Sequence, residues 1–219
     1  EMLNQSLEIY HRTIGSNTQE VADTLNNIAT IHTNQGRYGQ ALDKLHQSFE
    51  IYHRTIGSNP KQVANTLGNI ANIHMNQGRY DQALEMFDQS REIYHRTTGS
   101  NTKEVASTLN NIAIIHMNQG RYDQALEMLN QSREITHRTI GSNTKEVATT
   151  LNSIATIHTY QGRYDQALET LNQSLKINRN VFGPRSHHTH SSALALHRAA
   201  LFARLDGRTD IPPNPMHET

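Results

Sequence analysis

A pattern with a period of about 42 residues recurs along this chain and constrains its fold more than any other feature. The string QGRY begins at Gln35 and returns at Gln77, Gln119 and Gln161. A second string, GSN, keeps the same spacing from Gly15 onward. A repeat of this length is one supersecondary unit, and it buries its apolar face only by stacking on its neighbours. The sequence therefore predicts a solenoid of similar units.

Each unit contains two predicted helices, which the glycines of the two strings separate. The first helix ends at the glycine of QGRY, and the second runs from about Tyr38 to Thr55 in the first unit. Pro60 is expected at the first position of its helix, where its missing N–H does no harm. No unit alternates like a strand, which predicts an all-α protein.

Asparagine is the predicted N-cap of each first helix. A glutamate or glutamine follows three residues later, which is the spacing of a capping box. The four pairs are Asn17 with Glu20, Asn59 with Gln62, Asn101 with Glu104, and Asn143 with Glu146.

Apolar spacing predicts which faces are buried. On the first helix of the second unit the predicted stripe is Val63, Leu67, Ile70, Ala71 and His74. On its partner helix the predicted stripe is Ala83, Phe87, Ser90 and Tyr94. Ala83 and Ser90 are small, so the two backbones are expected to approach closely there.

The segment from Thr66 to Arg96, TLGNIANIHMNQGRYDQALEMFDQSREIYHR, resembles the tetratricopeptide repeat in the longer form found in kinesin light chains. The residues at the signature places of that family are Leu67, Ile70, Ala71, Gly78, Tyr80, Ala83 and Phe87. The resemblance implies an α-α superhelix, or solenoid, of about ten antiparallel helices. These form four full repeats, a leading half-repeat and a degenerate C-terminal capping helix. The chain departs from the family in having serine at Ser48, Ser90, Ser132 and Ser174, where alanine is common.

We expect four segments along the chain. Residues 1–16 are the second half of a truncated repeat, and residues 17–183 are four full tetratricopeptide repeats. Residues 184–206 form a degenerate capping helix, which matches the repeat only if about three extra residues are allowed, and residues 207–219 form a disordered tail. The helical pattern is already under way at Glu1, so we expect a longer parent protein.

The predicted binding site is the face of each first helix opposite the buried stripe, which is rich in asparagine. Its residues are Asn26, Asn27, Thr30, Asn34, Asn65, Asn69, Asn72, Asn76, Asn110, Asn111, Ile114, Asn118, Asn152, Ser153 and Tyr160. Asparagine is a poor helix former, but its amide suits the backbone of an extended peptide. The family resemblance implies that this face lines a concave groove. The alternative is compositional bias, because the whole chain is rich in Asn, Gln, Ser and Thr.

Charge on this face indicates the kind of ligand. None of the predicted site residues is Lys or Arg, which argues against the clamp that related domains use for acidic chaperone tails. Acidic residues such as Asp81, Glu85, Asp88 and Glu92 are expected on the outer side of the second helices. The sequence therefore predicts a protein or peptide ligand of neutral or mixed charge.

Histidine recurs at His32, His74, His116 and His158 on the apolar face. We interpret these as packed aromatic residues with one ring nitrogen hydrogen-bonded, and not as metal ligands. Protonation of a buried set predicts lower stability near pH 6.

Composition excludes several function classes. The chain lacks cysteine and balances 20 basic with 20 acidic residues, which argues against thiolate metal sites, nucleic acid and an anionic membrane. No stretch is apolar enough to span a membrane, and no nucleophile elbow or phosphate-binding loop occurs. We therefore expect a cytoplasmic protein that is not an enzyme and needs no cofactor or metal.

Three functions follow from this pattern. The first is a scaffold that binds extended peptides. The second is the regulatory or sensor arm of a larger multidomain enzyme, nucleotide-hydrolysing or transferase, whose catalytic part lies outside this segment. The third is a spacer that self-associates through exposed terminal helices such as Glu1–Ile14.

Overall fold

The computed structural model describes residues 2–55 and 60–205, which fall into two compact units, Glu1–Ser100 and Asn101–Thr219. The first unit contains α1 (Met2–Thr13), α2 (Gln19–Asn34), α3 (Tyr38–Thr55), α4 (Pro60–Asn76) and α5 (Tyr80–Thr98). The second contains α6 (Lys103–Asn118), α7 (Tyr122–Ile140), α8 (Lys145–Tyr160), α9 (Tyr164–Phe182) and α10 (His187–Leu205). The predicted all-α fold is confirmed, with ten helices in the described residues. The predicted tail at 207–219 lies outside them.

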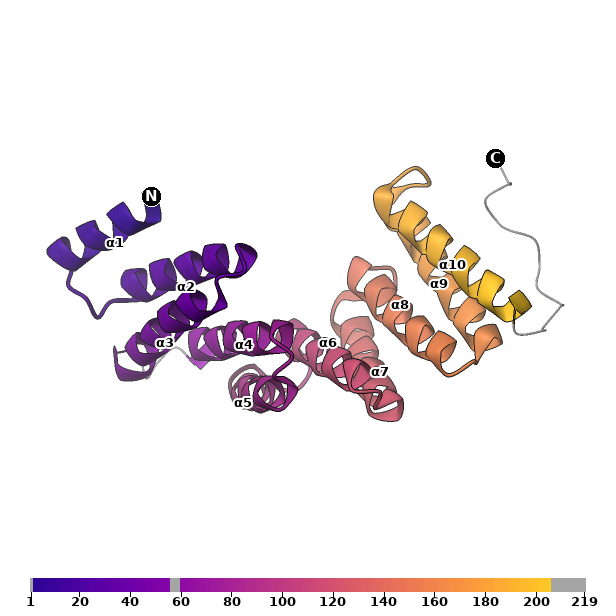
Figure 1. Ribbon diagram of the computed structural model, residues 1–219, viewed down its shortest axis with the longest axis horizontal. Helices are drawn as coiled ribbons and strands as arrows, with labels where there is room; N and C mark the ends of the chain where they lie inside the picture. Colours follow the sequence, from indigo (N-terminus) through magenta and orange to yellow (C-terminus); the bar gives the residue numbers. More distant parts are fainter. Residues whose placement is uncertain (1, 56–59, 206–219) are drawn as a thin grey trace. The chain divides into compact units, whose positions relative to one another are not determined.

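Helices pack in hairpin pairs within each unit (Figure 1). The closest partners are α2 with α3, α4 with α5, α6 with α7, and α8 with α9. Neighbouring pairs then contact each other, α3 against α4 in the first unit and α7 against α8 in the second. In addition, α1 packs on α2 and α10 packs on α9. This is the stacking that the repeat predicts.

The N-caps lie one residue later than predicted. The capping residues are Thr18, Thr102 and Thr144, in extended backbone, and each hydroxyl accepts a hydrogen bond from an N–H three residues on, at 3.3–3.4 Å. Glu20 is consequently the second residue of its helix, so the predicted capping boxes are wrong by one position. Asn59, the fourth predicted cap, lies outside the described residues.

Glycine ends the first helix of each pair, as predicted. Gly78 has φ of 72°, a left-handed conformation that glycine adopts without strain. The Arg79 N–H then donates to the His74 carbonyl at 2.9 Å, which closes the helix in a Schellman-type turn. The turn lets Tyr80 begin α5 directly afterwards.

Serine joins the two helices of every pair. The Ser90 hydroxyl of α5 is buried and donates to the Ala64 carbonyl of α4 at 2.8 Å. The same bond occurs three more times, at 2.8–3.0 Å, from Ser48 to Ala22, Ser132 to Ala106, and Ser174 to Ala148. Serine thus keeps the small size that close packing needs and satisfies its hydroxyl inside the core.

Burial on α5 agrees with the predicted stripe, whereas burial on α4 is wider. Ala83, Phe87, Ser90 and Tyr94 are all buried. On α4, Val63 and His74 are only half-buried, and Ala64, Thr66 and Ile73 are buried in addition to the predicted residues. The reason is that α4 packs against both α3 and α5, which covers a broader arc than one partner would.

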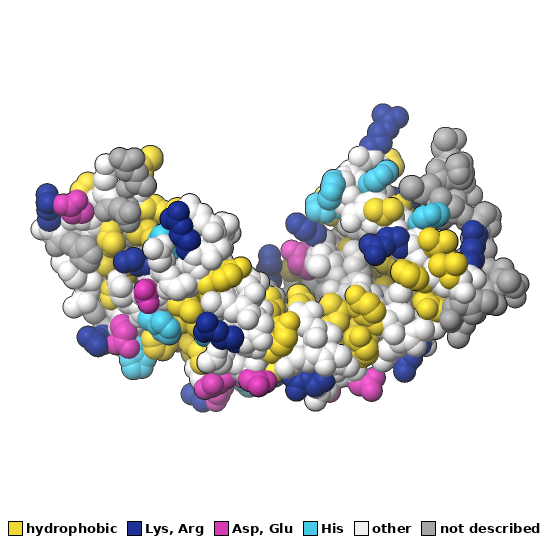
Figure 2. Space-filling view, in the orientation of Figure 1, with side chains coloured by type: hydrophobic (Ala, Val, Ile, Leu, Met, Phe, Trp, Pro, Cys, Tyr) yellow, Lys and Arg dark blue, Asp and Glu magenta, His cyan; other side chains and the backbone are white. Residues whose placement is uncertain are grey.

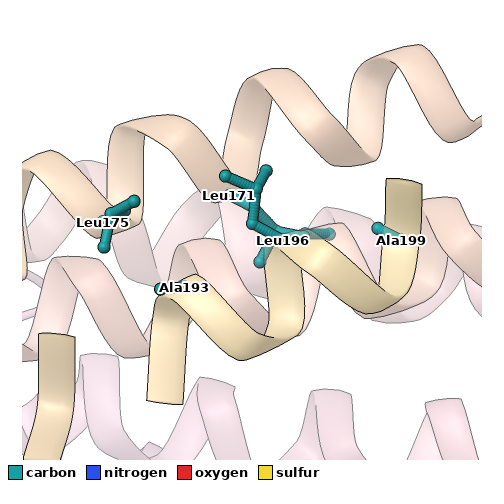
Figure 3. Packing of buried hydrophobic residues seen from close by; sticks show 6 residues of the cluster. Leu171, Leu175, Ala193, Leu196 and Ala199 are labelled. Atoms are coloured by element: carbon teal, nitrogen blue, oxygen red, sulfur yellow. The ribbon is translucent and has the colours of Figure 1, made fainter. Parts of the chain in front are cut away.

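The last helix continues the repeat in register. α10 begins at His187, one full repeat after Lys145 begins α8. Its buried Thr189, Ser192, Ala193 and Leu196 correspond, one repeat earlier, to buried positions of α8. The three extra residues that the sequence comparison allowed lie at the end of α10, which has 19 residues against 16 in α8. Figure 3 shows Leu196 of α10 against Leu171 of α9, with Ala193 and Ala199 on either side of Leu196 along its own helix.

Within the residues that the structure describes, every helix is too short or too polar to cross a bilayer.

Candidate functional site

The predicted binding face in the first unit is largely open to solvent. On α2, Asn27, Thr30 and Asn34 are exposed. On α4, Asn65, Asn69 and Asn76 are exposed and Asn72 is half-buried. The helical spacing of i, i+4, i+7 and i+11 places the four α4 amides along one side of the helix.

Asn26 is used inside the scaffold. Its Nδ2 lies 2.6 Å from the Ser48 hydroxyl of α3 and 3.3 Å from the Thr66 hydroxyl of α4. The Oδ1 of the same amide lies 3.5 Å from Nδ2 of Asn69. Asn26 therefore connects three helices, and its hydrogen-bonding capacity is largely taken up within the protein.

Two tyrosines of the second helices reach across to the same face. The Tyr52 hydroxyl donates to Oδ1 of Asp23, and the Tyr94 hydroxyl donates to Oδ1 of Asn65. Burial, then the hydrogen bond and negative charge of Asp23, raise the pKa of Tyr52 above its ordinary value. The sequence pattern identified Tyr94 as buried, but it did not identify these bonds, because each links residues 29 positions apart.

The face is more enclosed in the second unit. Asn111, Ile114 and Ser153 are half-buried, and Asn118 and Tyr160 are exposed. Asn110 accepts from the Thr150 hydroxyl at 3.3 Å, which links α6 to α8 as Asn26 links α2 to α4. Asn152 is half-buried with a buried Oδ1 that accepts no hydrogen bond from another described residue.

A depression of about 420 Å³ adjoins the site residues of α8. Asn152 and Tyr160 form one side of it, and Arg198 and Phe202 of α10 form the other. The exposed Tyr160 ring is stacked on Tyr122 at 5.9 Å between centroids. Sequence reasoning missed Arg198 and Phe202, because α10 was treated as a cap and not as part of the face.

The recurrent histidines are half-buried at the ends of the first helices, as His74 and His158 illustrate. Desolvation, then the nearby Arg79 and His46, lower the pKa of His74. Desolvation and Arg163 likewise lower the pKa of His158. In both rings Nδ1 is buried and has no hydrogen-bond partner among the described residues, so the expected bond does not involve this nitrogen.

Several acidic residues lie on the second helices, whereas Asp23 of α2 lies beside the predicted binding face. On α5, all four acidic residues named in the prediction are exposed: Asp81, Glu85, Asp88 and Glu92. They form local ion pairs such as Arg91 with Asp88 at 2.9 Å, which contribute little to stability at the surface. In the view of Figure 2, charged side chains lie scattered among uncharged ones. The described residues contain no group of His, Asp and Glu placed to hold a metal ion.

Comparison with known families gives matches over most of the chain. Models described as Tetratricopeptide repeat match residues 21–60, 62–136, 104–180 and 146–210. No curated protein matches the chain significantly.

Several solved structures share the fold. BtubC (BKLC) from P. vanneervenii has a TM-score of 0.77 at 16% identity, and the match covers 100% of this chain and 94% of that one. A putative kinesin light chain with nearly identical TPR-like repeats from Podosopora anserina has a TM-score of 0.71 at 19% identity, covering 84% and 88%. Aspartyl phosphate phosphatase F from Bacillus subtilis has a TM-score of 0.67 at 14% identity, and the match covers 86% of this chain but only 50% of that one. Identities this low are evidence of a common fold alone.

Proposed function

This chain belongs to the tetratricopeptide repeat family and is a repeat scaffold for protein interaction; we propose that it binds extended peptide segments along the asparagine-rich face of its first helices. Repeats of this family generally mediate protein–protein binding and typically form non-catalytic scaffolds.

The exposed amides of α4 are the observation that carries this proposal. Asn69 and Asn76 present side-chain amides to solvent on one side of a helix whose other side is packed. The Asn76 amide offers two donors and one acceptor, and Asn69, whose Nδ2 also lies 3.5 Å from Oδ1 of Asn26, keeps one donor and its acceptor. These groups match the alternating N–H and C=O groups of an extended peptide. A solvated helix face without a ligand gains nothing from asparagine, which lowers helix propensity by several tenths of a kcal/mol relative to alanine.

The contacts within the scaffold narrow the proposed ligand set. Asn26, Asn65 and Asn110 already hold hydrogen bonds to neighbouring helices, so we assign them to repeat stacking. The proposed ligand contacts are Asn27, Asn34, Asn69, Asn72, Asn76, Asn111 and Asn118.

The charge of the proposed site favours peptides that are neutral or of mixed charge. The ligand set contains no ionisable side chain, so it offers no clamp for a string of carboxylates. In the second unit, Arg198 is one basic group beside Asn152 and Tyr160, which suits a single acidic residue in an otherwise neutral segment.

The test is a selection of short linear peptides from a displayed random library on the full chain. Selected peptides are then measured by calorimetry against the triple variant Asn27→Ala, Asn69→Ala and Asn111→Ala. At about 1 kcal/mol for each amide contact, loss of Asn27 and Asn69 predicts a Kd roughly thirtyfold weaker for a peptide bound to the first unit. Loss of Asn111 predicts a Kd roughly fivefold weaker for a peptide bound to the second unit. N-methylation of alternate peptide bonds in the ligand should weaken binding as well, since the backbone is the recognised element.

The matched control removes three exposed asparagines from the second helices, as Asn130→Ala, Asn172→Ala and Asn180→Ala. This control should bind like the wild type. Equal binding by both triple variants would show that the asparagine face is not the binding surface.

A further inference from the structure

The second helices share one interior position that changes its residue along the chain. In the first two repeats it is Tyr52 and Tyr94, whose rings are 1% and 4% exposed. In the third it is Thr136, whose hydroxyl donates to the Ser132 carbonyl of its own helix at 2.8 Å. In the fourth it is Asn178, whose amide donates to Ser192 of α10 at 2.8 Å. The tyrosines and Asn178 thus reach a neighbouring helix, whereas Thr136 bonds within its own.

A cavity of about 290 Å³ lies beside Thr136, within the second unit. It is lined by residues of α6, α7 and α8, among them Ala106, Ser107, Asn110, Thr136, Ile140 and Thr149. In the first repeat the corresponding residues surround a buried tyrosine: Tyr52 stands at the position of Thr136, belongs to one core cluster with Ala22, the equivalent of Ala106, and donates to Asp23, the equivalent of Ser107. The cavity is thus where a tyrosine ring would lie if the third repeat had kept its tyrosine.

The third repeat keeps polar residues at the positions that hydrogen-bond the tyrosine hydroxyls in the first two repeats. Ser107 stands two repeats after Asp23 and one repeat after Asn65, the two residues that accept the tyrosine hydroxyls. Ser107 is exposed and lines the cavity. Asn110 adds an amide at the position of Asn26. Ala106 and Ile140 give the cavity an apolar wall and Ser107 gives it a hydrogen-bonding group, the features that favour a phenol ring. The lining also includes Lys103, Lys145 and Glu146, of which Lys103 and Glu146 form an ion pair at 3.6 Å between α6 and α8.

We propose that this cavity is a specificity pocket for the tyrosine side chain of a bound peptide, with the phenol hydroxyl donating to Ser107. The occupant is inferred from the chain itself, which places tyrosine rings at the two equivalent positions. The proposal rests on and deepens the proposed peptide-binding function, since a tyrosine held here would fix the position of an extended segment along α6 and α8.

The test uses a single-residue probe, which is too short to be bound as an extended peptide. Binding of the probe therefore reports on the cavity and not on backbone recognition by the asparagine-rich face. N-acetyl-tyrosinamide is titrated into the ¹⁵N-labelled full chain while backbone amide shifts are followed. Saturable shifts are expected at Ala106, Ser107 and Thr136. N-acetyl-phenylalaninamide should bind about three- to tenfold more weakly for want of the hydroxyl, and N-acetyl-alaninamide should give no saturable shift.

Two variants examine the pocket independently. Thr136→Tyr fills the cavity and should weaken the probe at least tenfold. The matched control is Thr97→Tyr, which removes an equivalent bond, from the Thr97 hydroxyl to the Ile93 carbonyl, at an exposed position and should bind the probe as the wild type does. Ser107→Ala changes only an exposed hydroxyl and should make the tyrosine and phenylalanine probes equal.

Several results would overturn the proposal. These are the absence of saturable shifts, shifts that persist in Thr136→Tyr, or a preference for tyrosine that survives Ser107→Ala. The Asn27, Asn69 and Asn111 triple variant should leave the probe unaffected, so failure of the peptide-binding proposal is recognised separately.

Discussion

At the scale of single residues, the serine of each second helix decides how closely a pair can pack. Ser90 is 1% exposed and touches the backbone of α4 through its hydroxyl. The site accepts a small side chain and no other. A methyl group fits the same volume, whereas a branched side chain must push the helices apart.

Ser90→Leu should therefore overpack the α4–α5 contact and destabilise the protein by about 1–3 kcal/mol. Ser90→Ala is the matched control and should cost about 1 kcal/mol or less, because only the hydrogen bond is lost. Denaturant unfolding measures both. A leucine variant as stable as the alanine variant would contradict this packing.

The histidines provide a pH dependence whose sign follows from burial. The pKa values of His74 and His158 are lowered in the folded state, so the unfolded chain binds more protons below its own histidine pKa of about 6.5. Stability is expected to be full above that pH and to fall as the pH drops through it.

Thermal melts at pH 7.5 and 5.5 should give a lower Tm at the acidic value. The double variant His74→Gln and His158→Gln should reduce the difference. Replacing the exposed His95 and His137 by Gln serves as the control and should leave it unchanged. Coincident wild-type melts at the two pH values would dismiss the idea.

At the scale of helices, α10 is held by one face only. Leu196 is 4% exposed and packs against Leu171 and Leu175 of α9, while Leu194, two residues earlier, is 50% exposed. The two residues are of the same type and lie in the same helix, but only Leu196 is buried. Comparing their substitutions therefore distinguishes the effect of packing from the effect of helix propensity.

Leu196→Ala should cost about 2–4 kcal/mol through lost burial and the cavity it leaves. Leu194→Ala should be nearly neutral, because alanine is the better helix former and the side chain is largely solvated. Chemical denaturation of the two variants gives the comparison. Similar losses would mean that α10 does not dock as described.

The bounds of the helices could be predicted closely because the glycines at helix ends and the spacing of apolar residues are local signals. The bounds of α3, Tyr38–Thr55, follow directly from them. The caps were missed by one residue because Asn17 and Thr18 are both good N-caps, and only the backbone decides between them. The stacking role of Asn26 could not be predicted, since its partner Thr66 is 40 residues away and meets it only when α4 stacks on α2.

At the scale of the whole molecule, contacts run between neighbours. Each described helix pair touches the pair before or after it within its unit. The free energy of unfolding of such an array is close to the sum of the stabilities of its repeats and of the interfaces between neighbours. A destabilising substitution is therefore expected to affect mainly its own repeat and the adjacent ones.

Hydrogen exchange of the backbone amides measures how far the effect of a destabilising substitution spreads along the chain. Ser48→Leu should reduce protection in α2–α4 and leave α8–α10 largely unchanged, and Ser174→Leu should do the reverse. A uniform loss of protection along the chain in either variant would indicate one cooperative body instead.

The serine bond of each pair has a consequence for how such a chain can change its length. Because donor and acceptor lie 26 residues apart within a single repeat, a whole repeat that is duplicated or deleted carries its own bond with it. An insertion or deletion of another length between the carbonyl and the hydroxyl changes their spacing and disrupts the bond. The array can therefore gain or lose whole repeats without losing these bonds. Its length can vary while the packing within each repeat stays the same.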